Sequence, residues 1–251
     1  MACKIYVETT VIVCASLGIK LGGKPLKHDK YDTAYNFLQY AEMAYDKKRD
    51  CFYITPSVVS EAYRVLEIAL NNMLENKLPS LSKKDLVRRR QVAEKFIQFF
   101  YNCLDQMDVW ISYLKQESFD SRKKDGIVVV LKDEFRKFDI DFRQEYGIEV
   151  ENFHFNFRNR RLRKVAKAVR TVQHKEAYKE YKPNPGRADI EIMAEVAAIN
   201  GGQEGEIYLV GEDGHFCAKK NRELLKNLCG INCRYSHEML AGGFVRSLLF
   251  A

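Results

Sequence analysis

Residues 183–216 read PNPGRADIEIMAEVAAINGGQEGEIYLVGEDGHF, and this stretch decides the fold class. Its Pro-Asn-Pro-Gly start is a strong break, and the apolar residues of 188–200 then recur at helical spacing until a Gly-Gly pair ends the pattern. The run IYLV at 207–210 has the composition of a buried strand, and a tight loop follows at 211–214. The stretch therefore predicts a helix, a strand and a turn in direct succession.

The same alternation extends in both directions along the chain. Strands are predicted at 4–7, 51–55 and 231–235, and helices at 31–45, 56–69 and 216–228, with a last helix from about residue 236. This order is typical of a parallel sheet with helices on both faces. We therefore predict an α/β fold, a three-layer sandwich around a central, mainly parallel sheet. Residues 80–182 interrupt the order and are mostly helical in character, so we expect a helical insertion there.

The composition is that of an ordinary globular protein, with 46% hydrophobic and 30% charged residues over 251 positions. It excludes collagen-like and low-complexity chains. No run approaches the roughly 18 apolar residues of a membrane-spanning helix, and charges interrupt the N-terminal stretch MACKIYVETT, unlike a secretory signal. We therefore expect a cytoplasmic protein without a membrane partner.

The seven cysteines fit that compartment, because their number is odd and most lie in apolar segments. Cys229 and Cys233, with His237 beyond them, have a spacing that a zinc site could use. A single such cluster, with one cysteine inside a predicted strand, fits buried structural thiols better. We favour thiols and keep zinc as the alternative.

Positive charge is concentrated in one segment. Residues 158–182 hold ten Lys or Arg against two Glu, whereas the whole chain has a net charge of +7. Apolar residues at three- and four-residue steps predict a helix whose other face is basic. We expect this face to bind the phosphate backbone of RNA; a solvated or partner-facing surface is the alternative. The candidate RNA-binding residues are Arg158, Arg160, Arg161, Arg163, Lys164, Lys167 and Arg170.

Acidic side chains fall where predicted strands end or helices begin. They are Glu8, Glu61, Asp189 and the pair Glu212 and Asp213. The carboxyl ends of parallel strands meet at one edge of a sheet, so we expect these carboxylates to lie close together there. An oxygen-only ligand set suits Mg²⁺ or Mn²⁺. Asp189 could instead serve the helix dipole, and Asp213 could be a turn former.

Four motifs in this order resemble the pattern of the PIN-domain nucleases. They are VETT at 7–10, PSVVSE at 56–61, RADIEIMAEVAA at 187–198 and LVGEDGHF at 209–216. The resemblance covers about residues 1–75 and 183–251, which divides the chain into a PIN-like domain (1–79 and 183–251) and a helical, basic insertion (80–182). The chain departs from the pattern twice, with Glu8 where the family usually has Asp, and with Gly211 and Glu212 where a hydroxyl residue usually precedes the last Asp.

The resemblance implies a metal-dependent endoribonuclease that hydrolyses single-stranded RNA. Glu8, Glu61, Asp189 and Asp213 would be its catalytic residues and its ligands for Mg²⁺ or Mn²⁺, supported by Thr9, Thr10 and Glu212. Ions held there would activate a water for in-line attack on phosphorus.

Several readings of function and partners remain beside this one. RNA, single-stranded or structured, is the expected partner, with a homodimer and an antitoxin-like protein as further candidates. The alternatives are a non-catalytic RNA-binding protein of PIN type and the toxin ribonuclease of a toxin–antitoxin pair. A phosphatase-like hydrolase fits less well, because no Asp-x-Asp follows the first strand.

Overall fold

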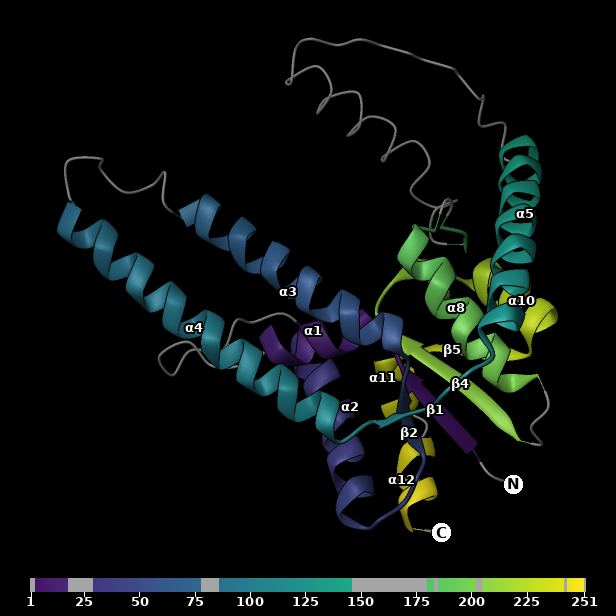
Figure 1. The fold of residues 1–251 in the computed structure, drawn as a ribbon, viewed down its shortest axis with the longest axis horizontal. Helices are drawn as coiled ribbons and strands as arrows, with labels where there is room; N and C mark the ends of the chain where they lie inside the picture. Colours follow the sequence, from purple (N-terminus) through teal and green to yellow (C-terminus); the bar gives the residue numbers. More distant parts are fainter. Residues whose placement is uncertain are drawn as a thin grey trace.

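Five parallel strands form the centre of the molecule (Figure 1). The computed structural model describes residues 3–17, 29–77, 86–145, 180–182, 185–201, 205–241 and 243–250. The strands are β1 (Cys3–Val7), β2 (Phe52–Ile54), β3 (Lys115–Gln116), β4 (Glu206–Gly211) and β5 (Ile231–Tyr235). Their order is β3-β2-β1-β4-β5, and each neighbouring pair is parallel. The predicted α/β fold with a parallel sheet is thereby confirmed.

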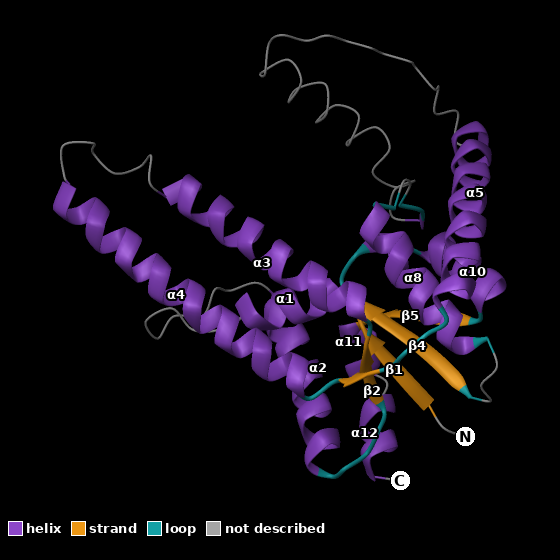
Figure 2. Cartoon of the chain, viewed as in Figure 1, coloured by secondary structure: helices purple, strands orange, loops and turns teal. Residues whose placement is uncertain are grey.

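Helices flank this sheet on two sides (Figure 2). They are α1 (Thr9–Leu17), α2 (Asp29–Asp46), α3 (Pro56–Lys77), α4 (Leu86–Ser112), α5 (Ser121–Glu145), α8 (Arg187–Asn200), α9 (Gly214–Cys217), α10 (Lys219–Cys229), α11 (Ser236–Ala241) and α12 (Phe244–Phe250). Helices α5 and α8 pack together, whereas α1, α11 and α12 each contact α2. Within the described ranges, no helix is both long and apolar enough to cross a bilayer.

The strands are apolar because helices cover both faces of the sheet. Ile5, Tyr6 and Val7 are consecutive in β1, and all three are buried. In a strand with one solvated face, every second side chain would be exposed, so an unbroken buried run marks a strand covered on both sides. The same logic applies to Leu209 and Val210 of β4.

The segment predicted as an insertion contributes to this same core in its described part. Its strand β3 pairs with β2, and Glu117 just after β3 accepts hydrogen bonds from Lys4 and Tyr6 of β1. Helices α4 and α5 bury Phe99, Cys103, Met107, Trp110, Leu131 and Phe135 in the core that also contains β1 and β4. Two helices, an edge strand and a shared core therefore join this segment to the sheet. The boundaries at 79/80 and 182/183 stay predictions.

The strand order changes direction between β1 and β4. From β1 the chain continues towards β2 and β3, whereas β4 and β5 lie on the other side of β1. Right-handed crossovers in opposite directions place the connecting helices on opposite faces. The loops after β1 and β4 therefore diverge, and ligands of open α/β sheets bind at such a point.

A buried carboxylate fixes the helix that carries Glu61. Glu195 of α8 is only 2% exposed, and it accepts hydrogen bonds from the backbone nitrogen of Ser57 at 3.1 Å and from its hydroxyl at 2.6 Å. Ser57 lies in the first turn of α3, where backbone N–H groups lack helical partners and the helix dipole favours a negative charge. This contact holds the start of α3 against α8.

The shared core makes a prediction about stability. Leu131→Ala in α5 removes a fully buried side chain, so it should lower the free energy of unfolding by about 2–5 kcal/mol. Val130 is 52% exposed on the same helix, so Val130→Ala should change that free energy by only about 0.5 kcal/mol. Urea denaturation monitored by circular dichroism measures both. Equal values for the two variants would show that α5 does not belong to the core.

Candidate acidic site

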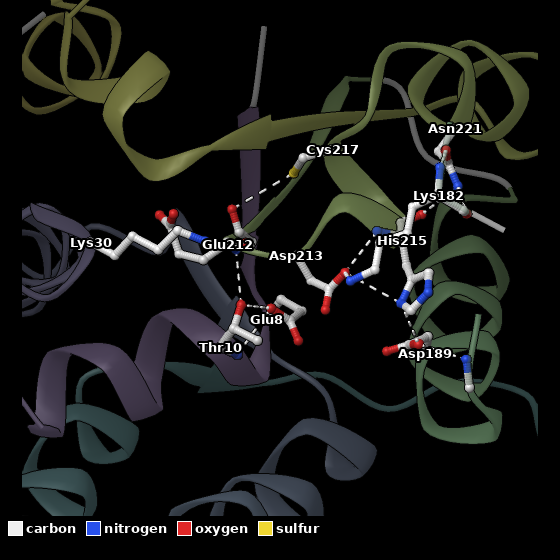
Figure 3. A network of polar contacts seen from close by, with 12 residues as sticks. Glu8, Thr10, Lys30, Lys182, Asp189, Glu212, Asp213, His215, Cys217 and Asn221 are labelled. Atoms are coloured by element: carbon white, nitrogen blue, oxygen red, sulfur yellow. Dashed lines mark hydrogen bonds and ion pairs between the residues drawn. The ribbon is translucent and has the colours of Figure 1, made fainter. Parts of the chain in front are cut away.

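Three of the predicted carboxylates face one space at the carboxyl edge of the sheet. Figure 3 shows the side chains of Glu8, Asp189 and Asp213 extending toward one another from three different parts of the fold. Glu8 follows β1, Asp213 follows β4, and Asp189 lies in the first turn of α8. The predicted convergence of strand ends thus brings these three together.

Glu8 is a buried carboxylate anchored through one oxygen. It is 2% exposed, and its Oε2 accepts hydrogen bonds from the backbone nitrogen of Thr10, at 2.9 Å, and from the Thr10 hydroxyl. Burial raises the pKa of Glu8 from 4.5 to about 8; the charges of Asp189 and Asp213 add to this rise, and the two Thr10 hydrogen bonds oppose it. Near neutral pH, this carboxyl therefore readily holds a proton.

Thr10 also links the loop after β1 to the loop after β4. Its hydroxyl donates to Glu8 and accepts a hydrogen bond of 2.9 Å from the backbone nitrogen of Glu212. Thr10 belongs to the first turn of α1, and Glu212 follows β4, so one hydroxyl fixes both loops relative to Glu8. The hydroxyl beside this carboxylate comes from Thr10, whereas position 211 is a glycine.

The two departures from the PIN pattern lie against each other. A Cβ atom placed on Gly211 would lie 3.1 Å from Glu8 Oε2, which is closer than ordinary van der Waals contact. The longer Glu8 side chain occupies the space into which a residue 211 side chain would project. The glycine and the glutamate are therefore sterically matched.

Asp213 combines a capping role with an ion pair. Its Oδ1 accepts hydrogen bonds of 2.8 Å from the backbone nitrogen of His215 and from the ammonium of Lys182. Burial by itself raises the pKa of Asp213, but the hydrogen bonds from the His215 backbone nitrogen and from the Lys182 ammonium outweigh it, so the pKa is lowered. Asp213 caps the turn, as expected of a turn former, and it also faces the space that it shares with Glu8 and Asp189.

Asp189 likewise caps a helix and faces the shared space. Its Oδ2 accepts a 2.7 Å hydrogen bond from the backbone nitrogen of Gly186 and thereby caps α8. The His215 Nδ1 atom lies 3.1 Å from this oxygen and 3.3 Å from Asp213 Oδ1. No group in the described part of the chain is oriented to form a hydrogen bond with that nitrogen. His215 therefore sits between two carboxylates by proximity rather than through a well-directed bond.

These carboxylates could hold a hard cation through their second oxygens. One oxygen of each carboxylate accepts hydrogen bonds from protein groups: Glu8 Oε2, Asp189 Oδ2 and Asp213 Oδ1. Among the described residues, the other oxygen of each makes no hydrogen bond or ion pair, and these are donors that Mg²⁺ and Mn²⁺ prefer. However, the described ranges contain no group of three or more His, Cys, Asp or Glu placed to ligate one ion directly. The donors fit in chemistry, and direct coordination would involve fewer than three of them.

The remaining predicted acidic residues are engaged elsewhere. Glu61 accepts a 2.9 Å hydrogen bond from the Thr9 hydroxyl and forms a 3.3 Å ion pair with Arg64, so both its oxygens are used. The Glu212 carboxylate accepts hydrogen bonds from the backbone and hydroxyl of Ser236 at the start of α11. Glu61 thus adjoins the site through Thr9, whereas the Glu212 side chain supports α11.

Two cationic or proton-carrying residues were missed by the sequence prediction. Lys182 reaches Asp213 from just before the Pro-Asn-Pro-Gly break, and His215 lies between Asp189 and Asp213. His215 stands inside a motif that already contained Asp213, so its position was a usable signal. Lys182 was visible only as one cation among many, and nothing in its local sequence separates it from the others.

Two further predictions find little or no test here. The basic residues Arg158, Arg160, Arg161, Arg163, Lys164, Lys167 and Arg170 lie outside the described residues. Burial raises the pKa of Cys233 to about 12 and that of Cys229 to about 11. Cys233 is buried and Cys229 is partly buried, and the choice between structural thiols and zinc ligands stays a prediction.

Comparisons of the chain with protein-family models, curated proteins and solved structures find no match in any of the three.

The contact between Gly211 and Glu8 predicts an energetic coupling. Gly211→Ala should lower the free energy of unfolding by about 1–3 kcal/mol, because the anchored Glu8 cannot move away from the new methyl group. In a Glu8→Asp background the shorter side chain leaves room, so the loss should be smaller, with a coupling of about 0.5–3 kcal/mol. A double-mutant cycle in urea measures this. An equal loss in both backgrounds would contradict the steric match.

The raised pKa of Glu8 predicts a pH-dependent stability. The folded-state pKa of about 8 lies above the ordinary 4.5, so the folded protein holds this proton more tightly than the unfolded chain. Relative to Glu8→Gln, the wild type should be most stable below about pH 4.5 and should lose that advantage as the pH rises through about 8. Unfolding free energies in EDTA across this range test it. A stability difference that does not change with pH would mean that the pKa of Glu8 is the same in the folded and unfolded states.

Proposed function

We propose that the protein is a metal-dependent endoribonuclease of PIN type that hydrolyses phosphodiester bonds of single-stranded RNA. One observation carries the proposal. Three carboxylates from separate elements meet at the carboxyl edge of a parallel sheet, each anchored through one oxygen, and within the described ranges the second oxygen of each has no protein partner. Capping accounts for one oxygen of Asp189 and of Asp213, and the convergence of all three carboxylates on one space is what supports a shared ligand.

Glu8, Asp189 and Asp213 would hold Mg²⁺ or Mn²⁺, with Glu61 adjoining through Thr9. A bound cation would supply an activated water and neutralise charge on the phosphate. Mg²⁺ commonly keeps several waters and uses only one or two carboxylates, so a bound ion would need direct contact with only part of this set.

The protein's own residues would prepare the site for this chemistry. Thr10 orients the Glu8 carboxyl, and the backbone of Gly186 orients Asp189. Asp213 is held ionised by His215 and Lys182, whereas Glu8 retains a proton to higher pH. Both carboxyls would bind a cation as carboxylates, so metal binding would release the proton that Glu8 holds near neutral pH.

The order of the motifs supports the PIN assignment. The carboxylates follow β1 and β4 and open α8, in the order that the PIN pattern requires, and they lie where the strand order changes direction, the point at which open α/β sheets bind ligands. The basic residues between Arg158 and Arg170 would hold the RNA backbone. A homodimer and an antitoxin-like partner stay predictions.

A non-catalytic RNA-binding protein is the second candidate. It is favoured by the ion pair between Lys182 and Asp213, because an ammonium already neutralises one carboxylate of the set. Metal-dependent cleavage and metal-dependent stability distinguish this candidate from the nuclease.

The decisive experiment compares Asp213→Asn with wild type on labelled single-stranded RNA. Wild type should cleave with Mn²⁺ or Mg²⁺ and stop with EDTA, and Asp213→Asn should lose cleavage by orders of magnitude because a charged ligand is gone. Asn is also a good helix cap, so the fold should survive. Asp105→Asn, an exposed change on α4, is the matched control and should cleave like wild type.

Thermal unfolding separates the two candidates without using activity. A metal that binds only the folded site at about 100 times its dissociation constant adds roughly 2.7 kcal/mol of stability. Mn²⁺ should therefore raise the Tm of wild type and of Asp105→Asn, but raise that of Asp213→Asn less. No Mn²⁺ effect and no cleavage by wild type would reject the nuclease.

A further inference from the structure

Lys182 is held in place by the protein core. The preceding residue, Tyr181, is fully buried, and its ring lies 4.9 Å from that of Phe138 in α5. The backbone nitrogen of Lys182 donates to Asn221 Oδ1 at 2.9 Å, and the Asn221 amide donates back to the Lys182 carbonyl at 3.0 Å. Asn221 is itself fully buried. The backbone of Lys182 is therefore fixed on both of its polar groups.

The same asparagine fixes the partner of Lys182. Asn221 also donates to the carbonyl of His215 at 3.1 Å, in the turn that Asp213 caps. A Cβ atom on Gly214 would lie only 3.0 Å from Lys182 Cδ, so the glycine leaves space for the lysine stem to pass over the turn. The buried amide of Asn221 and the absence of a Cβ atom at Gly214 thus position Lys182 relative to Asp213.

The ammonium of Lys182 remains accessible although its backbone is fixed. It lies 2.8 Å from Asp213 Oδ1, with 42% of its side chain exposed. An ion pair this exposed contributes only about 0–1 kcal/mol to stability. An ammonium has three N–H donors, and within the described residues this one bonds only Asp213, beside which Figure 3 shows it, so its other donors can contact a bound anion.

We propose that Lys182 is a substrate-binding residue that contacts the phosphate being cleaved, an inference that rests on the proposed nuclease function. Its ammonium donates to a non-bridging phosphate oxygen while it stays within hydrogen-bond distance of Asp213. The phosphate is thereby held between a fixed cation and the carboxylates that would bind metal. The alternative is that Lys182 only ties residues 180–182 to the turn after β4.

The test uses Lys182→Gln and Lys182→Arg in the full chain. Glutamine removes the charge but can still donate a hydrogen bond to Asp213, and arginine keeps the charge, so both should fold. Lys219→Gln is the matched control. The Lys219 side chain is 69% exposed, and its ion pair with Glu180 is long, at 3.7 Å, and therefore weak. Melting temperatures verify the fold of each variant.

Cleavage of single-stranded RNA with Mn²⁺ gives the first readout. Lys182→Gln should lower kcat/KM by about 10- to 100-fold, as expected for a lost hydrogen bond to a charged group, and Lys182→Arg should recover part of it. Lys219→Gln should cleave like wild type. Wild-type kinetics in a folded Lys182→Gln would overturn the proposal.

RNA binding gives a second readout that does not require cleavage. Fluorescence anisotropy with Ca²⁺ in place of Mn²⁺ yields the slope of log K against log salt concentration. Losing one phosphate contact to a single strand should lower its magnitude by about 0.7 in Lys182→Gln but not in Lys182→Arg or Lys219→Gln. An unchanged slope, or no RNA binding by wild type, would reject Lys182 as a phosphate contact. If wild type does not cleave RNA but Lys182→Gln still lowers the salt slope, the nuclease function is rejected and Lys182 remains a phosphate contact.

Discussion

The parallel pairing of β1 with β4 is the constraint on which the acidic site depends. Val7 lies opposite Val210, and the backbone nitrogen of Glu8 continues the ladder to the Val210 carbonyl at 2.9 Å. This register brings the residues after both strands to the same level. A shift of the register by one residue would turn the side chains to the other face and separate Glu8 from Gly211. The match between these two residues therefore also marks the correct register.

Assembling carboxylates at one edge creates a repulsion that the fold has to offset. The protein does so differently at each position. Glu8 is buried, with a raised pKa and a threonine that orients it, whereas Asp213 is paired with Lys182 and has a lowered pKa. Asp189 uses its negative charge at the start of a helix, where the dipole favours it. Each acidic residue thus has a local structural reason to be there, and within the described residues the second oxygen of each has no protein partner.

The surroundings of the site depend on contacts between elements that are distant in sequence. Glu195 of α8 holds the start of α3, and Asn221 of α10 holds Lys182 and the turn after β4. Both are buried polar side chains with fully defined partners, and such groups specify one arrangement because any other would leave them unsatisfied. Rigid support of this kind is what a binding site requires.

The sequence by itself determined the α/β class, the main strands and the carboxylates that meet at the sheet edge. These follow from local patterns, because apolar periodicity, helix breaks and the positions of acidic residues after strands can be read along the chain. Only the tertiary structure decided that β3 and helices α4 and α5 join the sheet and its core, and that Gly211 makes room for Glu8. It also decided the partners of three charged side chains: Glu61 pairs with Arg64, Glu212 binds Ser236, and Lys182 reaches Asp213. Each of these is a contact between residues far apart in sequence or a choice among several partners. Such choices depend on register, packing and side-chain direction, which no local pattern contains.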